Sequence, residues 1–444
     1  MSFEWKIKKV DEIKADISNA IAMGPFGSNI KTENFVARGV PVIRGINLSK
    51  GKLYEEEYVY ITEEKADELK SSNAFPGDLV FTHRGTLGQV GIIPFNSKYR
   101  RYVVSQSQMK LTCNTKKVNP LFVYYFFKSN IGQHALLMNT STTGVPAISR
   151  PVTSLKNIEI PLPALDEQQR IVDILNALDD KIELNNAINK NLEEMAQAIF
   201  KRWFVDFEFP NENGEPYKSS GGEFEESELG LIPRGWKLDC LDGIADYLNG
   251  LAMQKYRPDG EQFIPVIKIR ELNQGRTNSD SDKASPNIDK KYIVNNGDVL
   301  FSWSGTLDIK LWCGGIGGLN QHLFKVTSKN YDKWFYYYWT KHHIERFRRI
   351  ASDKATTMGH IKRNDLKEAK VLIPDPNNYQ KATDIFKPIV DKMIQLSVES
   401  FYLERVRDTL LPKLMSGEIR VPVEQDHSAP DLPMAAESSA IYQP

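Results

Sequence analysis

The sequence predicts an α+β protein in which two globular α/β domains, related by a pseudo-two-fold axis, are separated by two long antiparallel coiled-coil helices. Three observations lead to this fold class. The chain repeats itself at an offset near 211 residues, each copy contains short β-branched runs, and each copy ends in a long heptad-patterned segment. The 444 residues leave room for several domains of about 100–200 residues each. The sequence contains no run of about 18 apolar residues and no secretory signal, so we expect a cytoplasmic protein without a membrane span.

The repeat is strongest beside the long heptad-patterned segments. The motif LKNIEIPLP at residues 155–163 matches the stretch 366–376, and seven further identical pairs keep the offset of 211. Upstream the match is looser, as expected for copies whose loops differ in length. The pairs there include 41–44 with 265–268, 84–87 with 304–307, 105–106 with 320–321, and 142–143 with 356–357.

Runs rich in β-branched residues predict strands at equivalent places in both copies. They are VPVIRGI (40–46), GDLVF (77–81), FIPVIKI (263–269) and GDVLF (297–301). The aromatic runs at 122–127 and 334–339 predict the starts of helices packed on those strands. Consecutive aromatic residues are typical of a core, and platforms for base stacking are the alternative.

Residues 166–203 contain no Pro or Gly and predict a first long helix, with Asp166 near its N-cap and Glu167 in its first turn. Residues 378–415 repeat its heptad frame, and Pro388 predicts an early kink or a later start there. A helix of about 38 residues is about 57 Å long. A helix of that length with one apolar seam needs a partner, so we expect the two long helices to pack on each other. The seam positions are Ile171, Leu178, Asn185, Leu192, Ile389, Leu396, Leu403 and Leu410.

Asn185 is the polar member of this seam, at the place where the second copy has Leu396. An Asn in a seam can fix the register of two helices at some cost in stability. The alternative is an Asn turned to solvent.

Positive and negative charges are sorted along the chain, although 57 basic residues balance 57 acidic ones. Residues 79–158 hold ten Lys or Arg and no Asp or Glu, and residues 301–363 hold eleven basic and four acidic residues. Residues 151–250 hold nine basic and twenty acidic residues. Basic blocks interleaved with amide, hydroxyl and aromatic side chains favour contact with nucleic acid. A solvated basic face is the alternative.

Motifs for catalysis or cofactor binding are missing from the sequence. Cys113, Cys240 and Cys313 lie far apart without a CxxC pattern, which predicts neither a disulfide framework nor a zinc site. There is no GxxxxGK[ST] loop and no Asn/Asp-Pro-Pro-aromatic motif, and the glycine run at 314–318 lacks GxGxxG spacing. We therefore predict no catalytic residue, no metal and no cofactor on this chain.

Motifs around the first long helix resemble a known family. IPLPALDEQQRIVDIL (160–175), FKRWFVDFEFP (200–210), PYKSSGG (216–222) and IPRGW (232–236) resemble the central conserved region of type I restriction–modification specificity subunits. LLPKLMSGEIRV (410–421) resembles the distal conserved region of that family. The resemblance extends over residues 1–421 in domain order and is weakest inside the two globular domains.

The resemblance implies a non-catalytic subunit whose two target recognition domains each read half of a bipartite site in double-stranded DNA. It implies that the helices set the unspecified spacer and dock two methyltransferase subunits, to which two restriction and motor subunits can add. S-adenosylmethionine and ATP would bind those partners and not this chain. The residues alone leave two alternatives, a non-catalytic helical scaffold and a stand-alone DNA-modifying enzyme.

The domain boundaries follow from the repeat and the resemblance together. We place the first recognition domain at 1–163, the central helix at 164–205, a mostly irregular acidic linker at 206–230, the second recognition domain at 231–376, the distal helix at 377–417 and a disordered tail at 418–444.

Four places match the family's recognition pattern. They are the loop 24–29 in the first copy, the turns at 84 and 303–306, the polar runs 105–108 and 320–322, and the segments 142–150 and 356–363. Arg, Gln and His side chains there can reach base edges, and lysines suit phosphates. Arg84 becomes Ser304 in the second copy, so we expect the two domains to read different bases. The candidate DNA-binding residues are Gly27, Ser28, Arg44, Arg84, Gln106, Gln108, Lys110, Thr142, Thr143, Arg150, Lys268, Arg270, Trp303, Ser304, Gln321, His322, Lys325, Thr356, Thr357, Lys362 and Arg363.

Overall fold

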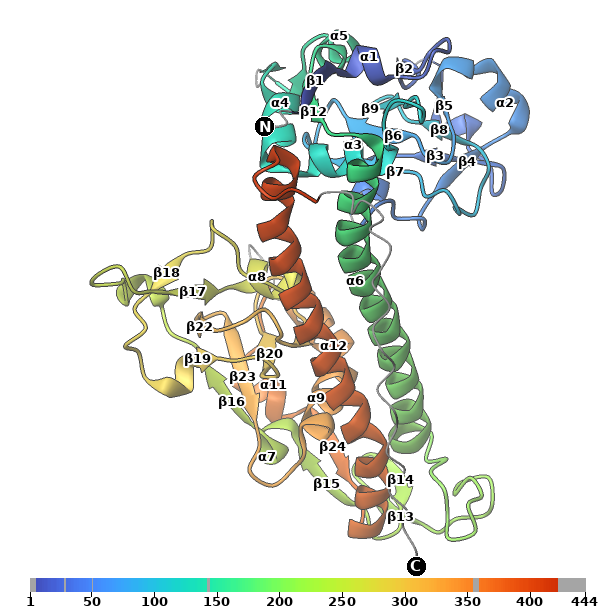
Figure 1. The fold of residues 1–444 in the computed structure, drawn as a ribbon. Helices are drawn as coiled ribbons and strands as arrows, with labels where there is room; N and C mark the ends of the chain where they lie inside the picture. Colours follow the sequence, from blue (N-terminus) through green and yellow to red (C-terminus); the bar gives the residue numbers. More distant parts are fainter. Residues whose placement is uncertain (1–4, 28, 50, 142–143, 354–358, 422–444) are drawn as a thin grey trace, which may run out of the picture. The chain divides into compact units, whose positions relative to one another are not determined.

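A computed structural model describes residues 5–27, 29–49, 51–141, 144–353 and 359–421 of the chain (Figure 1). The chain forms two compact units. Unit 1 joins residues 1–179 to residues 406–444, and unit 2 is the continuous stretch 180–405. In the part of the chain that is described, no helix is long and apolar enough to cross a membrane.

Unit 1 contains two four-stranded sheets, with strand orders β2-β9-β6-β7 and β4-β3-β8-β5. The pairing of β3 with β8 is parallel. A separate antiparallel pair joins β1 (Lys6–Lys9) to β12 (Glu159–Leu162). The sheet strands are β2 (Ile21–Met23), β3 (Val40–Ile43), β4 (Val59–Ile61), β5 (Asn73–Ala74), β6 (Leu79–Thr82), β7 (Val90–Ile92), β8 (Tyr102–Val104) and β9 (Gln108–Leu111). The shorter elements are α1 (Val10–Ile13), α2 (Glu63–Glu68), α3 (Pro120–Lys128), α4 (Asn130–Leu137), α5 (Pro151–Lys156), β10 (Thr140–Ser141) and β11 (Ala147–Ile148).

Unit 2 repeats this topology strand for strand, with orders β16-β23-β20-β21 and β18-β17-β22-β19 and a parallel pairing of β17 with β22. The predicted internal repeat is therefore confirmed as a repeat of the fold. The strands are β15 (Lys237–Cys240), β16 (Asp246–Asn249), β17 (Ile264–Ile267), β18 (Lys283–Ala284), β19 (Ile293–Val294), β20 (Val299–Ser302), β21 (Ile309–Leu311), β22 (Gly317–Leu319), β23 (Leu323–Thr327) and β24 (Lys370–Ile373). The helices are α7 (Leu241–Ile244), α8 (Ile269–Gln274), α9 (Lys333–His342), α10 (Ile344–Asp353) and α11 (Arg363–Lys367).

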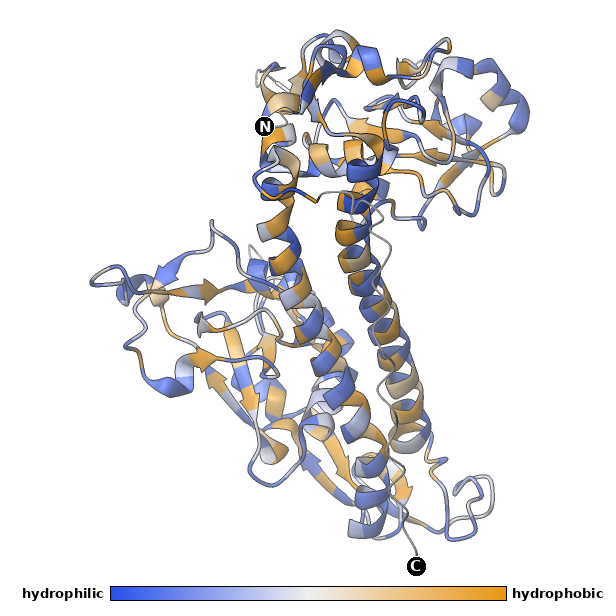
Figure 2. Ribbon diagram, in the orientation of Figure 1, coloured by the Kyte–Doolittle hydropathy of each residue, from blue (hydrophilic) through white to orange (hydrophobic). Residues whose placement is uncertain are grey.

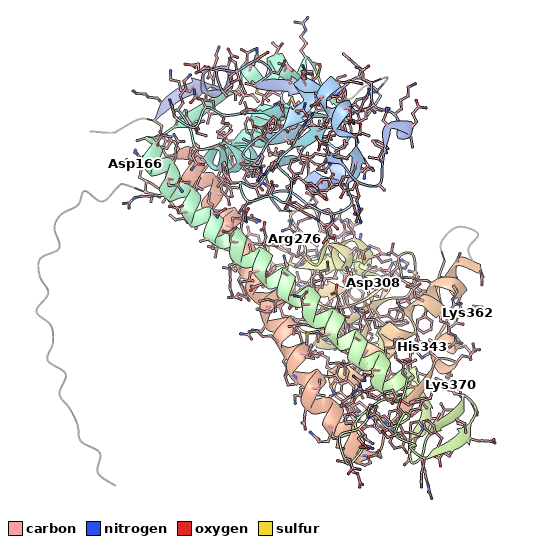
Figure 3. The ribbon with its side chains drawn as sticks, turned by 90° about the vertical axis from the view of Figure 1, so that its right-hand side faces the viewer. Asp166, Arg276, Asp308, His343, Lys362 and Lys370 are labelled. Atoms are coloured by element: carbon pink, nitrogen blue, oxygen red, sulfur yellow. The ribbon has the colours of Figure 1, made fainter. Side chains whose placement is uncertain are left out.

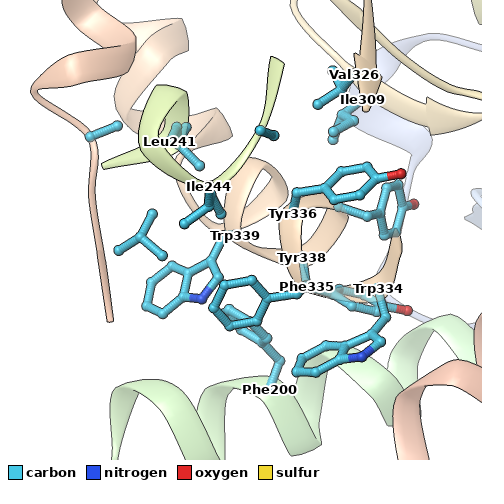
Figure 4. Close-up of a cluster of buried hydrophobic side chains, with 14 of the residues drawn as sticks. Phe200, Leu241, Ile244, Ile309, Val326, Trp334, Phe335, Tyr336, Tyr338 and Trp339 are labelled. Carbon is cyan, nitrogen blue, oxygen red and sulfur yellow. The ribbon is translucent and has the colours of Figure 1, made fainter. Parts of the chain in front are cut away.

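The two aromatic runs form helices α3 and α9, and both lie in the cores. Asn119 caps α3 by accepting a hydrogen bond from the Leu121 N–H at 2.9 Å, and every residue from 122 to 127 is buried. In unit 2, Trp334 lies in the buried hydrophobic cluster of Figure 4, and it stacks on Phe386 with ring centroids 4.8 Å apart. Burying one such ring contributes about 2 kcal/mol. The prediction of core aromatics is confirmed, and the base-stacking alternative is wrong.

Helix α6 (Leu165–Phe200) and helix α12 (Pro376–Ser416) are the two predicted long helices, and apolar and polar residues alternate along both (Figure 2). In unit 1, Glu167 binds Arg420 at 2.7 Å and Asp179 binds Arg407 at 2.7 Å. Going from Glu167 to Asp179 along α6, the partner on the C-terminal segment moves back from Arg420 to Arg407. The two segments therefore run antiparallel. Of the predicted seam residues in this unit, Ile171 is buried, and Leu178 and Leu410 are half-buried.

In unit 2 the same antiparallel pairing joins Asn185 to Glu399 and Asn189 to Ser397, both at 2.9 Å. Asn185 is fully buried, so its predicted place in the seam is confirmed and the solvent-facing alternative is wrong. Leu396 is buried, and Leu192, Ile389 and Leu403 are half-buried.

The ends of the long helices differ in detail from the prediction. Helix α6 begins at Leu165, so Asp166 lies in the first turn with Glu167 and is not the N-cap. Helix α12 begins at Pro376 and continues through Pro388, so a late start is wrong. Both Pro388 and Asp384, four residues earlier, are exposed, so water can bond the carbonyl that loses its N–H partner.

The acidic linker at 206–230 is more ordered than predicted. The Phe209 ring stacks between Tyr217 at 4.5 Å and Trp236 at 5.0 Å. Strands β13 (Phe224–Ser227) and β14 (Gly230–Pro233) then form a hairpin. Aromatic residues in and next to the linker therefore pack together and order it, although its acidic composition predicted an irregular chain.

The predicted disordered tail lies mostly outside the described residues, which end at residue 421. Residues 418–421 contradict that prediction, because Ile419 and Val421 pack on the core of unit 1. The Arg420 guanidinium also lies 5.6 Å from the centre of the Trp5 ring.

Candidate nucleic-acid interface

In unit 1, the ends of strands β3, β6 and β9 surround a hollow of about 390 Å³. Strand ends meet here because β6 pairs with β9 in one sheet while β3 pairs with β8 in the next. We call it the first hollow. It is lined by Ile30, Phe35, Val42, Arg44, Gly45, Thr82, Arg84, Thr86, Gln89, Ser105, Gln106, Ser107 and Gln108. The lining includes two arginines and no acidic residue, so it suits an electron-rich ligand.

Arg84 and Gln106 are exposed at the first hollow. The Arg44 side chain is partly buried, and its Nη2 donates to the Glu57 carbonyl at 3.0 Å. Its buried Nε has no hydrogen-bond partner among the described residues. Buried polar groups are nearly always bonded. This N–H donor is therefore available to an acceptor from water or from a ligand.

In unit 2, a second hollow of about 340 Å³ lies at the equivalent place in the repeat. It is lined by Gln254, Lys268, Ile269, Arg270, Asn320, Gln321 and His322. Lys268 is the repeat partner of Arg44, and Gln321 is the repeat partner of Gln106. The structure thus places predicted residues together at one site in each unit.

The second hollow differs from the first in its hydrogen-bonding groups. The Oε1 of Gln321 is buried and has no donor among the described residues, so this hollow offers an acceptor where the first offers a donor. Lys268 pairs with Asp282 at 2.5 Å, and Arg270 pairs with Glu271 at 2.7 Å. Glu271 is buried, and burial alone would raise the pKa of its carboxyl. The hydrogen bond from Arg270, together with bonds from neighbouring groups, outweighs burial, so the pKa of Glu271 is lowered.

A glycine permits the close approach of a loop to each hollow. A Cβ on Gly24 would overlap the Ser105 carbonyl, and a Cβ on Gly250 would overlap the Asn320 carbonyl. Gly24 of the loop 24–29 is therefore required by the packing of the protein itself, independently of any ligand. At Gly27 a Cβ would lie 2.6 Å from the Gln106 Oε1, which brings the tip of this loop beside the first hollow.

Four predicted contact residues bond within the protein, which does not favour a direct DNA contact for them, although Gln108 also lines the first hollow. Gln108 and Ser304 are buried and bond to Thr82 and His322. Lys110 is buried beside Asp78 with its Nζ 3.7 Å from the carboxylate, and Lys325 binds Asp298 at 2.7 Å. Strands β9 and β23 alternate their side chains between faces, so a basic residue there can serve the interior.

Other predicted residues lie at the surface near the hollows. Arg150 and Lys362 are exposed and come directly before helices α5 and α11, as Figure 3 labels for Lys362. The exposed Arg363 donates to the Tyr247 carbonyl at 3.2 Å. Five predicted residues lie outside the described part of the chain, namely Ser28, Thr142, Thr143, Thr356 and Thr357.

Sequence reasoning missed His83, which precedes Arg84 at the end of β6. Its ring is buried, and its Nε2 lies 3.1 Å from the Gln106 carbonyl. Burial lowers the pKa of this imidazole, which therefore stays neutral at neutral pH. The repeat could have identified His83, because Trp303, which was predicted as a site residue, occupies the same position before Ser304 as His83 occupies before Arg84.

A comparison with protein families fits both units. The model of the type I restriction modification DNA specificity domain matches residues 14–194 and again residues 233–399, which together exceed half of the chain. The chain belongs to this family.

Specificity subunits of two other organisms are similar to it in sequence. The type I restriction enzyme MjaIX specificity subunit of Methanocaldococcus jannaschii is 26% identical over 437 residues, which cover 94% of each chain. The HindI specificity subunit of Haemophilus influenzae is 24% identical over 377 residues, covering 72% of this chain and 81% of the relative.

The fold is also that of a solved specificity subunit. The crystal structure of the S subunit of a type I restriction–modification system from M. genitalium covers 93% of this chain and 97% of its own, with a TM-score of 0.55 and 16% identity. The predicted specificity-subunit fold, with a domain that occurs twice, is confirmed. Its membership of the family makes the chain a DNA-recognition subunit of the type I restriction–modification class, and the predicted alternatives are not supported.

Proposed function

We propose that each unit of this specificity subunit reads one half of a bipartite DNA site, and that its hollow holds the residues that contact the bases. The observation that carries the proposal is the equivalence of the two hollows. They lie at the same place in the repeated fold, both lack acidic lining residues, and each contains a Gln at the aligned position 106 or 321. Arg bonds best to the two acceptors of guanine, and Gln matches the donor and acceptor of adenine.

The differences between the hollows predict two different half-sites. The first contributes the guanidinium groups of Arg44 and Arg84. At the second, Ser304 replaces Arg84 and is buried, while Gln321 keeps an unbonded acceptor. We propose that guanine is read at the first hollow and adenine at the second. Arg150, Lys362 and Arg363 are our candidates for phosphate contacts.

We further propose that helices α6 and α12 set the spacer and bind two methyltransferase subunits, with two restriction and motor subunits added to that complex in the cytoplasm. In unit 2, helix α6 offers an apolar surface for such binding, since Leu184 and Met195 are 54% and 55% exposed. These two positions are eleven residues apart, close to three helical turns, so they share one face. In this proposal S-adenosylmethionine and ATP bind the partner subunits only.

The test is to co-express the chain with its methyltransferase subunit in a host that lacks adenine methylation, and to map every methylated adenine. We expect a single bipartite motif with a fixed gap and one adenine on each strand. A complex that binds DNA without methylating a defined motif would contradict the proposal. A chain that forms no complex and binds no DNA would favour the scaffold alternative.

A further inference from the structure

The residue that follows β6 and the residue that follows β20 make the same contact in both units, although one is His83 and the other is Trp303. His83 lies 3.1 Å from the Gln106 carbonyl through Nε2, and Trp303 lies 3.2 Å from the Gln321 carbonyl through Nε1. A carbonyl oxygen can only accept, so the ring nitrogen donates in each case. The two acceptors belong to the aligned Gln residues of the hollows.

Covalent geometry explains how two different side chains fill this role. The His Nε2 and the Trp Nε1 both belong to a five-membered ring, and each lies two bonds from Cγ. An imidazole and an indole on equivalent backbones therefore present an N–H at nearly the same point. The larger Trp303 ring also donates to the Asn249 Oδ1 at 3.1 Å.

The backbone of the same residue anchors a third segment of each recognition site. The Ile148 N–H donates to the His83 carbonyl at 2.9 Å, and the Ile361 N–H donates to the Trp303 carbonyl at 3.0 Å. Two residues further on, a second backbone hydrogen bond joins the same segments. The Gly85 N–H donates to the Pro146 carbonyl and the Gly305 N–H donates to the Gly359 carbonyl, both at 2.9 Å. One residue thus links the turn at 84 or 304, the Gln at 106 or 321, and the segment before α5 or α11.

The ring of this residue is directed into the protein. His83 is 9% exposed, and Trp303 is half-buried with its ring 5.9 Å from both the His322 and Phe324 rings. In both residues the ring N–H already donates to the main-chain carbonyl of Gln106 or Gln321. Any effect of His83 or Trp303 on DNA would therefore pass through that Gln.

We propose that His83 and Trp303 are the positioning residues of the two recognition sites. Each holds the main chain of its Gln through the ring N–H and thereby fixes where that Gln side chain enters the hollow. This inference rests on the proposed reading of one half-site by each unit. In this inference both units keep the hydrogen bond from the ring N–H to the Gln carbonyl, while the side chains that read the bases differ between the units.

The test uses the full chain in complex with methyltransferase subunits, and measures methylation of the mapped site and of single-base variants in each half. Trp303→Phe keeps an aromatic ring and removes the N–H, whereas Trp303→His keeps an N–H two bonds from Cγ. We expect Trp303→Phe to reduce discrimination in the half-site of unit 2 by about tenfold and to leave the other half-site unchanged. Trp303→His should restore discrimination to within about twofold, and salt dependence should be unaltered because phosphate contacts are untouched.

His83 provides the matched experiment in unit 1 and replaces the first if Trp303→Phe does not fold. His83→Phe should reduce discrimination only in the half-site of unit 1. His83→Gln should restore it, because the Gln amide nitrogen is also two bonds from Cγ.

Three results would overturn the inference. They are folded Phe variants with unchanged discrimination, loss at both half-sites together, or N–H-bearing variants that lose as much as the Phe variants. A wild-type complex that recognises no bipartite site would instead count against the proposed function.

Discussion

Asn185 of helix α6 is completely buried, and its Nδ2 donates to the Glu399 Oε2 of helix α12 at 2.9 Å. Lys181, one turn earlier, lies 3.4 Å from the same carboxylate. The Oδ1 of Asn185 has no donor among the described residues. This polar contact thus specifies one pairing of the two helices in unit 2 without fully satisfying its own groups.

Asn185→Asp should destabilise the protein by about 3 kcal/mol at pH 8, because it places a carboxylate against Glu399 in a buried seam. Repulsion and burial both raise the pKa of the new group in the folded state, so this loss should shrink as pH falls and the group protonates. Urea unfolding of both proteins at pH 8 and pH 5 measures the difference. Asn185→Leu is the control, since it copies Leu396 and should change stability by less than about 1 kcal/mol. An equal loss for Asp at both pH values would contradict this explanation.

Lys110→Met should cost about 3 kcal/mol, because it leaves the Asp78 carboxyl buried without its cation. The two side chains are only 5% and 3% exposed, and burial raises the pKa of Asp78 while it lowers that of Lys110. Lys325→Met is the matched change in unit 2. Its pair with Asp298 is more exposed, so the cost should stay below about 1 kcal/mol. Thermal unfolding measures both, and a reduced salt dependence of DNA binding in Lys110→Met would return Lys110 to the interface.

His343 should make the protein less stable in acid. Burial is the main cause that lowers the pKa of its imidazole to about 4 from an ordinary value of 6.5, and its Nε2 donates to the Lys370 carbonyl at 2.7 Å. Between these two values the unfolded chain binds a proton that the folded chain refuses, so stability falls as pH drops from about 7 to 4. The contribution is about 3 kcal/mol when complete. In His343→Gln the free energy of unfolding should change less over that range, and an unchanged pH slope would exclude His343 as its source.

Arg84→Ala should relax the specificity of a single base pair in one half-site, at a cost of about 1–3 kcal/mol. Arg84→Lys is the informative control, because it keeps the charge and loses the two-pronged geometry that suits guanine. Both variants should therefore lose discrimination at that base pair, whereas Lys alone should preserve overall affinity at low salt. The measurement is competition binding of the assembled complex with single-base variants of the mapped site. Altered preference in the other half-site would refute independent reading.

Seven residues inserted after Asp180 in α6, with seven more after Arg405 in α12, should lengthen the unspecified spacer and leave both half-site sequences unchanged. The added helix measures about 10.5 Å, which corresponds to about three base pairs of duplex. Mapping of methylated adenines reads the new spacer directly. A heptad inserted in α6 alone is the control and should abolish the pairing pattern. A changed half-site sequence with the old spacer would show that the helices do not measure distance.

The repeat in the sequence predicted most of the fold, because strands and helices recur wherever hydrophobic patterns recur. Sequence patterns were weaker for individual site residues, since a Lys on a strand such as Lys110 can face the core as readily as the solvent. His83 was missed because its role depends on a contact between residues 23 positions apart. Phe209 and Trp236 ordered a linker whose carboxylates suggested irregular chain, because packing of a few aromatic rings outweighs average composition.

The composition of unit 1 from two distant stretches of chain sets an order of events during synthesis. Residues 180–405 emerge from the ribosome as one continuous stretch and can fold as soon as they are made. Residues 1–179 are synthesised first, yet their core takes Leu411, Leu414 and Met415 from the last part of the described chain. The first-made domain is therefore the last to be completed, and a nascent chain that stalls before residue 411 leaves its apolar docking surface for those three side chains open.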